Sequence, residues 1–408
     1  MLVAPIYLLA SILTPGGLFR DRRFRDVGLY GDYARELLDG RVPYRDYFVE
    51  YPPGGFLVFT PPAFLPEGWY LHAFKVLMAL LGVATLAVVA LVLERLGATD
   101  RRLFGVLLAI ALSPLVIGPV ALNTYDAFPA LLVVGALAAL LYGRDSLALG
   151  LLAAAFAAKL FAAALLPLAV LWLWRTRRPL LRPLVAFAAV VVVLVGPFAL
   201  LGWNGLVESV RAQAGRSLQV ESLGGAVLLV ADRLGVYDAE VVSGSTAAVS
   251  RDLAGALPDA LAAVSTLLQL GAVVFVAALF VRGRPSSTRL AVGTAATLAG
   301  FLAFARFISP QYLVWLVPVV PLAGVVPAAL LGAALLLGRL WFFHYGDVFD
   351  VAGIVWLVAI RDVLLVALYG VLVRTMMPSS SNTVRHDSLR SSRESGTAAV
   401  DGDERRSR

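Results

Sequence analysis

Residues 76–93 read VLMALLGVATLAVVALVL and carry no charge. A helix of this length, at 1.5 Å per residue, is close to the ~30 Å thickness of membrane hydrocarbon. Other long uncharged runs lie at residues 103–125, 127–143, 183–207, 260–281, 290–305 and 307–338. A transmembrane β-barrel would need short alternating segments instead. The runs therefore predict an all-α polytopic membrane protein with about 12 hydrophobic segments.

The composition agrees with this class and excludes others. The chain is 60% hydrophobic and 15% charged, and its mean hydropathy is +0.84. It has no cysteine, which excludes disulfides, thiol catalysis and Cys-ligated metals. Its histidines, His72, His344 and His386, are too far apart in sequence to predict a His-rich metal site, although carboxylates alone could still hold a cation. The net charge of +7 comes mainly from arginines in short loops, so it does not indicate nucleic-acid binding.

The arginine clusters predict the orientation of the segments. They lie at residues 95–102, at 144, at 175–182, at 282–289 and from 374 into the tail. The positive-inside rule makes these loops cytoplasmic and leaves two long loops, about 20–69 and 203–257, on the outer face. Both termini are then cytoplasmic. A further cluster, Arg20, Arg22, Arg23 and Arg25, falls on the outer side and opposes the rule.

Several local expectations complete this topology. The first 19 residues are interpreted as a first span or signal anchor, because they lack a basic n-region and a cleavage site. Segment 147–174 has arginines at both ends. This predicts two short helices that enter the membrane and return to the same side, with a hinge near Lys159. Residues 310–324 are expected to span the membrane. The membrane domain covers 1–377, and the polar segment 378–408 is predicted to be a disordered cytoplasmic tail.

The first outer loop is unusually acidic and rich in tyrosine. Residues 26–53 read DVGLYGDYARELLDGRVPYRDYFVEYPP. The face formed by Tyr30, Tyr33, Ala34, Leu37 and Leu38 has helical spacing and predicts a short amphipathic helix on the membrane surface. Asp26 stands at the N-cap position and Gly40 at the C-cap position. Prolines 43, 52 and 53 predict irregular chain after this helix. On this evidence alone Asp26 could be a helix cap or a functional carboxylate.

Polar residues also interrupt the apolar runs. Lys159 lies within AAAFAAKLFAAALLP (153–167), where it either snorkels to an interface or pairs with a lipid phosphate. Arg306, Gln311 and Tyr312 lie within RFISPQYLVWLVP (306–318), at the outer end of a long apolar run. Asp126 repeats the pattern. The adjacent Arg361 and Asp362 are interpreted as a structural charge pair.

Together these stretches resemble a known family. The first-loop residues Asp26, Tyr30, Leu37-Leu38-x-Gly40, Pro43-Tyr44 and Tyr51-Pro52-Pro53 look like the first outer loop of GT-C superfamily glycosyltransferases. More narrowly, the chain resembles the polyprenyl-phosphate-mannose-dependent mannosyltransferases of glycosyltransferase family 87. The further landmarks are YDAFP (125–129), AKLF (158–161), RSLQVES (216–222) and SPQYLVW (309–315). Ala162 departs from the family, which usually has proline there.

The resemblance implies a reaction and assigns roles. Such enzymes pass a sugar from a polyprenyl or dolichyl phosphate to an acceptor hydroxyl on the outer leaflet, usually with inversion, and a first-loop carboxylate is the base. By position this base is Asp26. The leaving phosphodiester needs positive neighbours. The donor phosphate and lipid are expected to contact Arg306, Lys159, Arg216, Gln311 and Tyr312. The sugar and acceptor are expected to contact Tyr30, Tyr51, Asp126, Gln219, Glu221 and Ser222.

The expected protein is therefore a plasma-membrane hexosyltransferase, with mannose as the sugar and a glycan or glycolipid as the acceptor. The lipid-linked sugar is a co-substrate, and no other cofactor and no metal are expected. Aromatic side chains near the interface could equally be membrane anchors. Two other functions remain open: a lipid or glycan flippase, which would place paired charges near the bilayer midplane, and an inactive relative that scaffolds a glycan pathway.

Overall fold

The computed structural model describes residues 3–16, 26–243, 250–343 and 353–377. The arginine cluster at 20–25 and the tail 378–408 lie outside the described residues. The elements are α1 (Val3–Gly16), α2 (Asp26–Leu38), η1 (Pro53–Gly55), α3 (Phe56–Ala63), η2 (Glu67–Trp69), α4 (Tyr70–Arg95), α5 (Asp100–Ile117), α6 (Val120–Asn123), α7 (Ala127–Leu141), α8 (Asp145–Ala158), η3 (Leu160–Leu165), α9 (Leu166–Arg175), α10 (Leu181–Ala214), β1 (Leu218–Gln219), α11 (Leu223–Arg233), β2 (Glu240–Ser243), β3 (Arg251–Ala254), α12 (Ala256–Arg282), α13 (Ser287–Ala303), η4 (Pro310–Leu316), η5 (Val320–Ala323), α14 (Val325–Phe343) and α15 (Ile354–Met376).

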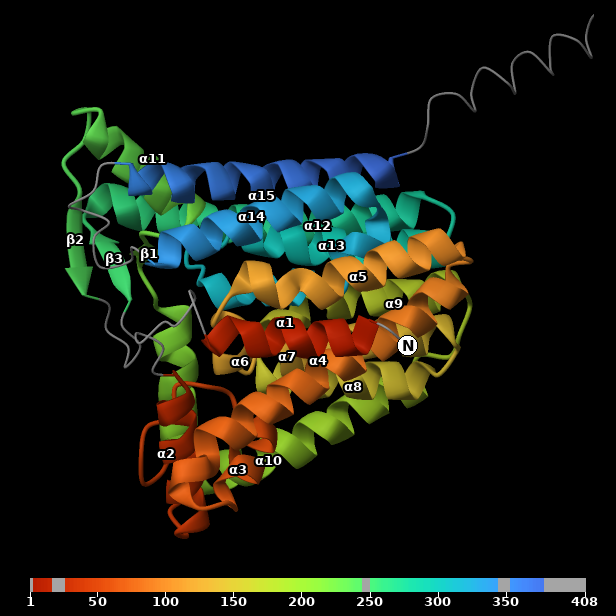
Figure 1. The fold of residues 1–408 in the computed structure, drawn as a ribbon, viewed down its shortest axis with the longest axis horizontal. Helices are drawn as coiled ribbons and strands as arrows, with labels where there is room; N and C mark the ends of the chain where they lie inside the picture. Colours follow the sequence, from red (N-terminus) through yellow and green to blue (C-terminus); the bar gives the residue numbers. More distant parts are fainter. Residues whose placement is uncertain (1–2, 17–25, 244–249, 344–352, 378–408) are drawn as a thin grey trace, which may run out of the picture.

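The predicted all-α membrane class is confirmed, while the count of about 12 segments is not. Among the described residues, five helices are long and apolar enough to cross a membrane: α4, α10, α12, α14 and α15. Figure 1 shows the long helices side by side, with α2, α3 and the strands gathered at one end of the bundle. We call this end the loop end. The opposite end, with the turns at 96–99, 143–144, 176–180 and 283–286, is the arginine end.

Short capped turns join the helices at the arginine end. Thr99 accepts a hydrogen bond from the backbone of Arg102 and begins α5, and Ser286 does the same for Arg289 and α13. Gly97 closes α4 with a positive φ of 64°, which costs little only for glycine. Caps of this kind let tight turns satisfy the free backbone groups of helix ends.

The segment around Lys159 enters and returns, as its flanking arginines predict. Helix α8 ends at Ala158, Lys159 has extended backbone (φ −151°, ψ 128°), and η3 and α9 follow. After α9, Arg178 reaches the start of α8, where its Nη1 lies 2.8 Å from Asp145 Oδ1. The start and the end of the segment therefore lie together, and Lys159 sits at its turning point.

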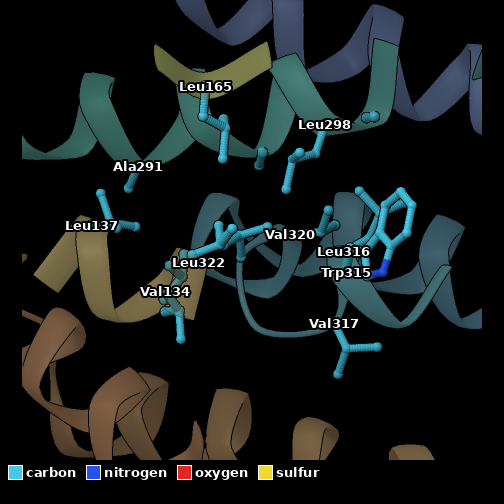
Figure 2. Close-up of a cluster of buried hydrophobic side chains, with 14 of the residues drawn as sticks. Val134, Leu137, Leu165, Ala291, Leu298, Trp315, Leu316, Val317, Val320 and Leu322 are labelled. Carbon is cyan, nitrogen blue, oxygen red and sulfur yellow. The ribbon is translucent and has the colours of Figure 1, made fainter. Parts of the chain in front are cut away.

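The predicted span at 310–324 is not a transmembrane helix. It forms two 3₁₀ segments, η4 and η5, because Pro310, Pro318 and Pro321 remove backbone donors at intervals that a continuous α-helix cannot accept. Its side chains fill the centre of the bundle instead. Figure 2 shows Leu316 and Val320 of this segment between α7 and α13, and the same residues belong to the main buried cluster.

The first outer loop contains more helix than predicted. The expected helix is α2, and Gly40 (φ 85°) closes it: the Arg41 N–H bonds to Glu36 O and the Gly40 N–H to Leu37 O, a Schellman motif. The irregular chain expected beyond Pro52 and Pro53 is wrong, since η1 and α3 follow them. Prolines in the first turn of a helix lose no hydrogen bond, so they start this helix rather than prevent it.

The second outer loop is shorter than predicted and contains strands. Helix α10 bends at Gly202 (φ −143°, ψ 41°) and continues to Ala214, so residues 203–214 are helix rather than loop. A small antiparallel sheet, in the order β1-β3-β2, follows and is the exception to the all-α class. The bend packs on the first loop: a Cβ on Gly205 would lie 1.8 Å from Tyr44 O, so only glycine permits this contact.

Candidate active site

Asp26 begins α2 at the loop end and is only partly buried. It is the first helical residue, where the partial positive charge of the helix N-terminus favours a carboxylate. Burial nevertheless raises the pKa of Asp26 from 3.8 to about 6. Lys159 opposes this rise, whereas the carboxylates of Asp126 and Glu50 add to it. Asp26 therefore lies close enough to all three for their charges to act on it.

Three tyrosines lie beneath Asp26. The rings of Tyr30, Tyr51 and Tyr125 meet edge to face, with each pair of ring centroids 5.4 Å apart. Tyr30 and Tyr125 are buried, and the Tyr30 hydroxyl interacts with the Asp26 carboxylate. Tyr30 is therefore a core residue rather than a membrane anchor. The cluster joins α2, the chain before η1 and the chain before α7, which come from distant parts of the sequence.

Lys159 is held by a buried carboxylate. Its Nζ lies 2.5 Å from Asp126 Oδ1, and Trp315 Nε1 donates to the same oxygen at 2.6 Å. The ammonium also faces aromatic rings, 4.7 Å from the centroid of Tyr125 and 5.0 Å from that of Tyr312. Cation–π contact and ion pairing together offset the cost of burying this charge. Snorkelling to an interface is excluded in this structure, because Lys159 is 8% exposed and turned into the protein.

A second ion pair joins the two outer loops beside the first. Arg216 Nη2 lies 2.6 Å from Glu50 Oε1, and the two side chains are 9% and 2% exposed. The Gln213 amide donates to the backbone carbonyl of Glu50 at 3.2 Å. Arg216 lies near enough for its charge to act on the Lys159 ammonium and the Tyr312 hydroxyl. The structure thus brings four of the residues assigned from sequence, Asp26, Lys159, Asp126 and Arg216, around one place.

Arg306 lies at the edge of this group and is held by the second loop. Its guanidinium donates to Ala214 O, and its own carbonyl accepts from the Gln219 N–H at 2.9 Å. The Gln219 side chain accepts from the Ile308 N–H at 2.9 Å. Gln219 therefore fixes the segment that leads to Gln311 and Tyr312, both of which are partly exposed.

Glu221 and Ser222 have partners in α15 and α11. Ser222 caps α11, since its hydroxyl accepts from the Gly225 N–H at 3.1 Å. Glu221 lies 3.5 Å from Arg361 of α15, and Arg361 also pairs with Asp362 at 2.9 Å. The interpretation of Arg361 and Asp362 as a structural pair agrees with this geometry. The assignment of Glu221 and Ser222 to the acceptor stays a prediction that no contact here supports.

Sequence reasoning did not place Glu50 in the site. Its signal is a single carboxylate within an otherwise apolar and aromatic stretch, YFVEYPPGG (47–55), which predicts a buried charge that needs a partner. By contrast, Asp32 is exposed and Glu36 is partly exposed, and they pair with Arg35 and Arg41 on the same helix or just beyond it.

The arrangement combines the groups that glycosyl transfer requires. A partly exposed carboxylate with a pKa of about 6 can accept a proton near neutral pH. Two cations nearby, Lys159 and Arg216, can stabilise negative charge that develops on a leaving group. Both cations already have carboxylate partners, so they are fixed in place before any substrate binds.

The family assignment follows from a match to a family model. No curated protein sequence matches the chain. The model for glycosyltransferase family 87 matches residues 48–310, which include Glu50, Asp126, Lys159, Arg216 and Arg306 and begin after Asp26. The match covers more than half of the chain and agrees with the resemblance seen in its motifs. With its long apolar helices, this chain is a membrane protein and belongs to glycosyltransferase family 87.

Proposed function

We propose that the protein transfers a hexose from a polyprenyl phosphate to a hydroxyl of a glycan or glycolipid, and that this hexose is mannose. The observation that carries this proposal is the partly exposed Asp26 beside two buried cations at one end of the bundle. A lipid-linked donor suits a site at the end of membrane-crossing helices. The family supports glycosyl transfer, and we propose the identity of the sugar and of the lipid carrier.

The proposed reaction is a single displacement. The acceptor oxygen bonds to the anomeric carbon of the sugar as Asp26 takes its proton. The bond from that carbon to the phosphate oxygen breaks, and its electron pair leaves with the phosphate. One carboxylate on the acceptor side suffices for this step, and the configuration at the anomeric carbon inverts.

The leaving phosphate is assigned to the cations. Lys159 lies close enough to Asp26 for its charge to act there, Arg216 lies close to Lys159, and Arg306 lies at the edge of this group. A phosphate that leaves as an anion needs charge stabilisation rather than a proton. Arg306 is partly exposed, so it suits the first contact with an arriving anion. From the positive-inside rule, we propose that this end of the bundle lies on the outer face.

The test is a transfer assay in membranes. Vesicles that contain the protein receive labelled polyprenyl-phosphate-mannose together with a set of glycan and glycolipid acceptors. The expected result is loss of label from the lipid and its appearance in one acceptor class, with Asp26→Asn inactive and Asp32→Asn active. Equal transfer by wild type and Asp26→Asn would overturn the assignment of the base. Transfer from another lipid-linked sugar would correct the sugar alone.

A further inference from the structure

A buried carboxylate beside the proposed base has no role in the reaction described so far. Glu50 lies in the first outer loop, directly before Tyr51, and is 2% exposed. Only its Oε1 has partners, Arg216 and Gln213, whereas Oε2 is buried without a hydrogen bond. A buried carboxylate oxygen without a partner is costly. A role in charge balance would explain why this group is an acid rather than an amide.

The geometry fixes what Glu50 can influence. Its ion pair with Arg216 is the link that ties the chain after α10 to the chain before η1. Around Asp26, the charged groups come from four elements: Glu50 from the loop, Asp126 before α7, Lys159 after α8, and Arg216 through its pair with Glu50. The hydroxyls of Tyr30 and Tyr51 also face this group. Glu50 pairs with Arg216, and Asp126 pairs with Lys159.

We propose that Glu50 is a positioning residue of the transfer reaction: it holds Arg216 toward the donor phosphate and keeps a negative charge beside Asp26. This inference rests on the proposed function for its meaning in catalysis. Glu50 does not touch the reacting atoms. It acts on the phosphate side through Arg216, and on the acceptor side by keeping Asp26 a strong enough base.

Removing this charge favours the ionised form of Asp26. In Glu50→Gln, Asp26 loses a like charge that raises its pKa, and Glu50 no longer offsets the positive charge of Arg216. The pKa of Asp26 therefore falls, and the expected shift is about one pH unit. A weaker base also lowers the maximal rate.

Four variants separate this role from a purely structural one. Glu50→Gln removes the charge of the carboxylate that pairs with Arg216 and keeps a side chain that can hydrogen-bond to it. The double variant Glu50→Gln with Arg216→Gln removes both charges and keeps two side chains that can hydrogen-bond. Arg216→Gln alone removes the cation. Glu36→Gln is the matched control, because Glu36 also pairs with an arginine, Arg41 at 2.5 Å, in the same loop but at an exposed place.

The experiment follows Asp26 directly. Infrared difference spectra between pH 4 and pH 9 record the protonated carboxyl stretch of the full-length protein, and Asp26→Asn assigns the band. We expect the Asp26 midpoint to fall by about one pH unit in Glu50→Gln, to rise in Arg216→Gln, and to return toward wild type in the double variant. Glu36→Gln should match wild type. An unchanged midpoint in Glu50→Gln would overturn the inference.

Transfer measured on the same samples separates the two proposals. We expect Arg216→Gln and the double variant to share a raised donor KM, while only the double variant recovers the wild-type pH profile. If wild type transfers sugar but the Asp26 midpoint is the same in Glu50→Gln, the inference fails and the proposed function stands. If the midpoint shifts as expected but wild type transfers nothing, the proposed function fails and the influence of Glu50 on Asp26 stands. A double variant that recovers both the pH profile and the donor KM would overturn the role of Arg216.

Discussion

The Asp26 site and the Arg361 network, formed by Arg361, Asp362 and Glu221, both contain buried charge at the loop end. They differ in their exposure to solvent. In each, carboxylates lie around cations: Asp26, Glu50 and Asp126 lie near Lys159 and Arg216, while Glu221 and Asp362 pair with Arg361. In each, burial raises the pKa of one carboxylate, Asp26 to about 6 and Glu221 to about 7.

Exposure separates the two groups. Asp26 is partly exposed, whereas Arg361, Glu221 and Asp362 are 0–3% exposed. Arg361 also donates to the Glu221 carbonyl, which joins α15 to the turn before α11. A sealed group of this kind stabilises packing, because no hydroxyl can deliver a proton to it. Buried charge alone therefore does not identify a reactive carboxylate. A reactive carboxylate needs a raised pKa and also an exposed surface that substrate can reach.

The largest expected effect comes from Asp26→Asn. Transfer should fall by about 10²–10⁴-fold, since the acceptor loses its base. Its pKa is raised above the unfolded value, so Asp26 favours the folded state most at low pH and loses that contribution as pH rises through about 6. At pH 7.5 the variant should therefore melt above wild type, and at pH 4 this gain should vanish. Turnover and melting temperature at both pH values measure this.

The comparison supplies the control. Glu221→Gln also removes a carboxylate with a raised pKa, yet turnover per folded molecule should stay within about twofold of wild type. A loss of turnover as large as that of Asp26→Asn would show that the sealed network takes part in the reaction.

Sequence predicted the class and the separate elements of the site better than their contacts. Uninterrupted apolar runs predict helices, and the capping pattern of α2 is local, so both were readable. The pairing of Lys159 with Asp126 joins residues 33 positions apart, and that of Glu50 with Arg216 joins residues 166 apart. Local patterns do not encode such distances. The apolar run at 310–324 misled because hydropathy does not separate a buried 3₁₀ segment from a span.

Arg361→Met tests the sealed side of the comparison. It leaves Glu221 and Asp362 as buried carboxylates without their cation, so we expect a loss of about 3–5 kcal/mol in stability and far less folded protein. Turnover per folded molecule should not change. Folded yield by size-exclusion chromatography and turnover of the monodisperse fraction measure both quantities. Arg374→Met, on an exposed part of the same helix, is the control and should leave the yield unchanged.

Lys159→Met tests the reactive side. It removes a cation from the site and leaves Asp126 buried and unpaired, so we expect transfer to fall by roughly 10²-fold and folded yield to drop. Adding Asp126→Asn should restore the yield, because no unpaired charge remains, but not the transfer. Recovery of transfer in the double variant would mean that the pair is structural, like Arg361 and Asp362. The assay reports kcat and donor KM beside folded yield.

The smallest effect is expected from Trp315→Phe, which sharpens the comparison to one hydrogen bond. The change removes the donor that lies 2.6 Å from Asp126 Oδ1 and keeps an aromatic ring to stack on Phe161, whose centroid is 3.6 Å away. A hydrogen bond to a charged group contributes about 1.5–3 kcal/mol, and Lys159 still pairs with the same oxygen, so we expect a loss near the lower value. If Asp126 serves to aim Lys159, donor KM should rise by a few fold while the melting temperature falls by only a few degrees. Trp174→Phe, at an exposed tryptophan, should change neither quantity. A lower melting temperature with an unchanged KM would instead place Trp315 with the residues that only support packing.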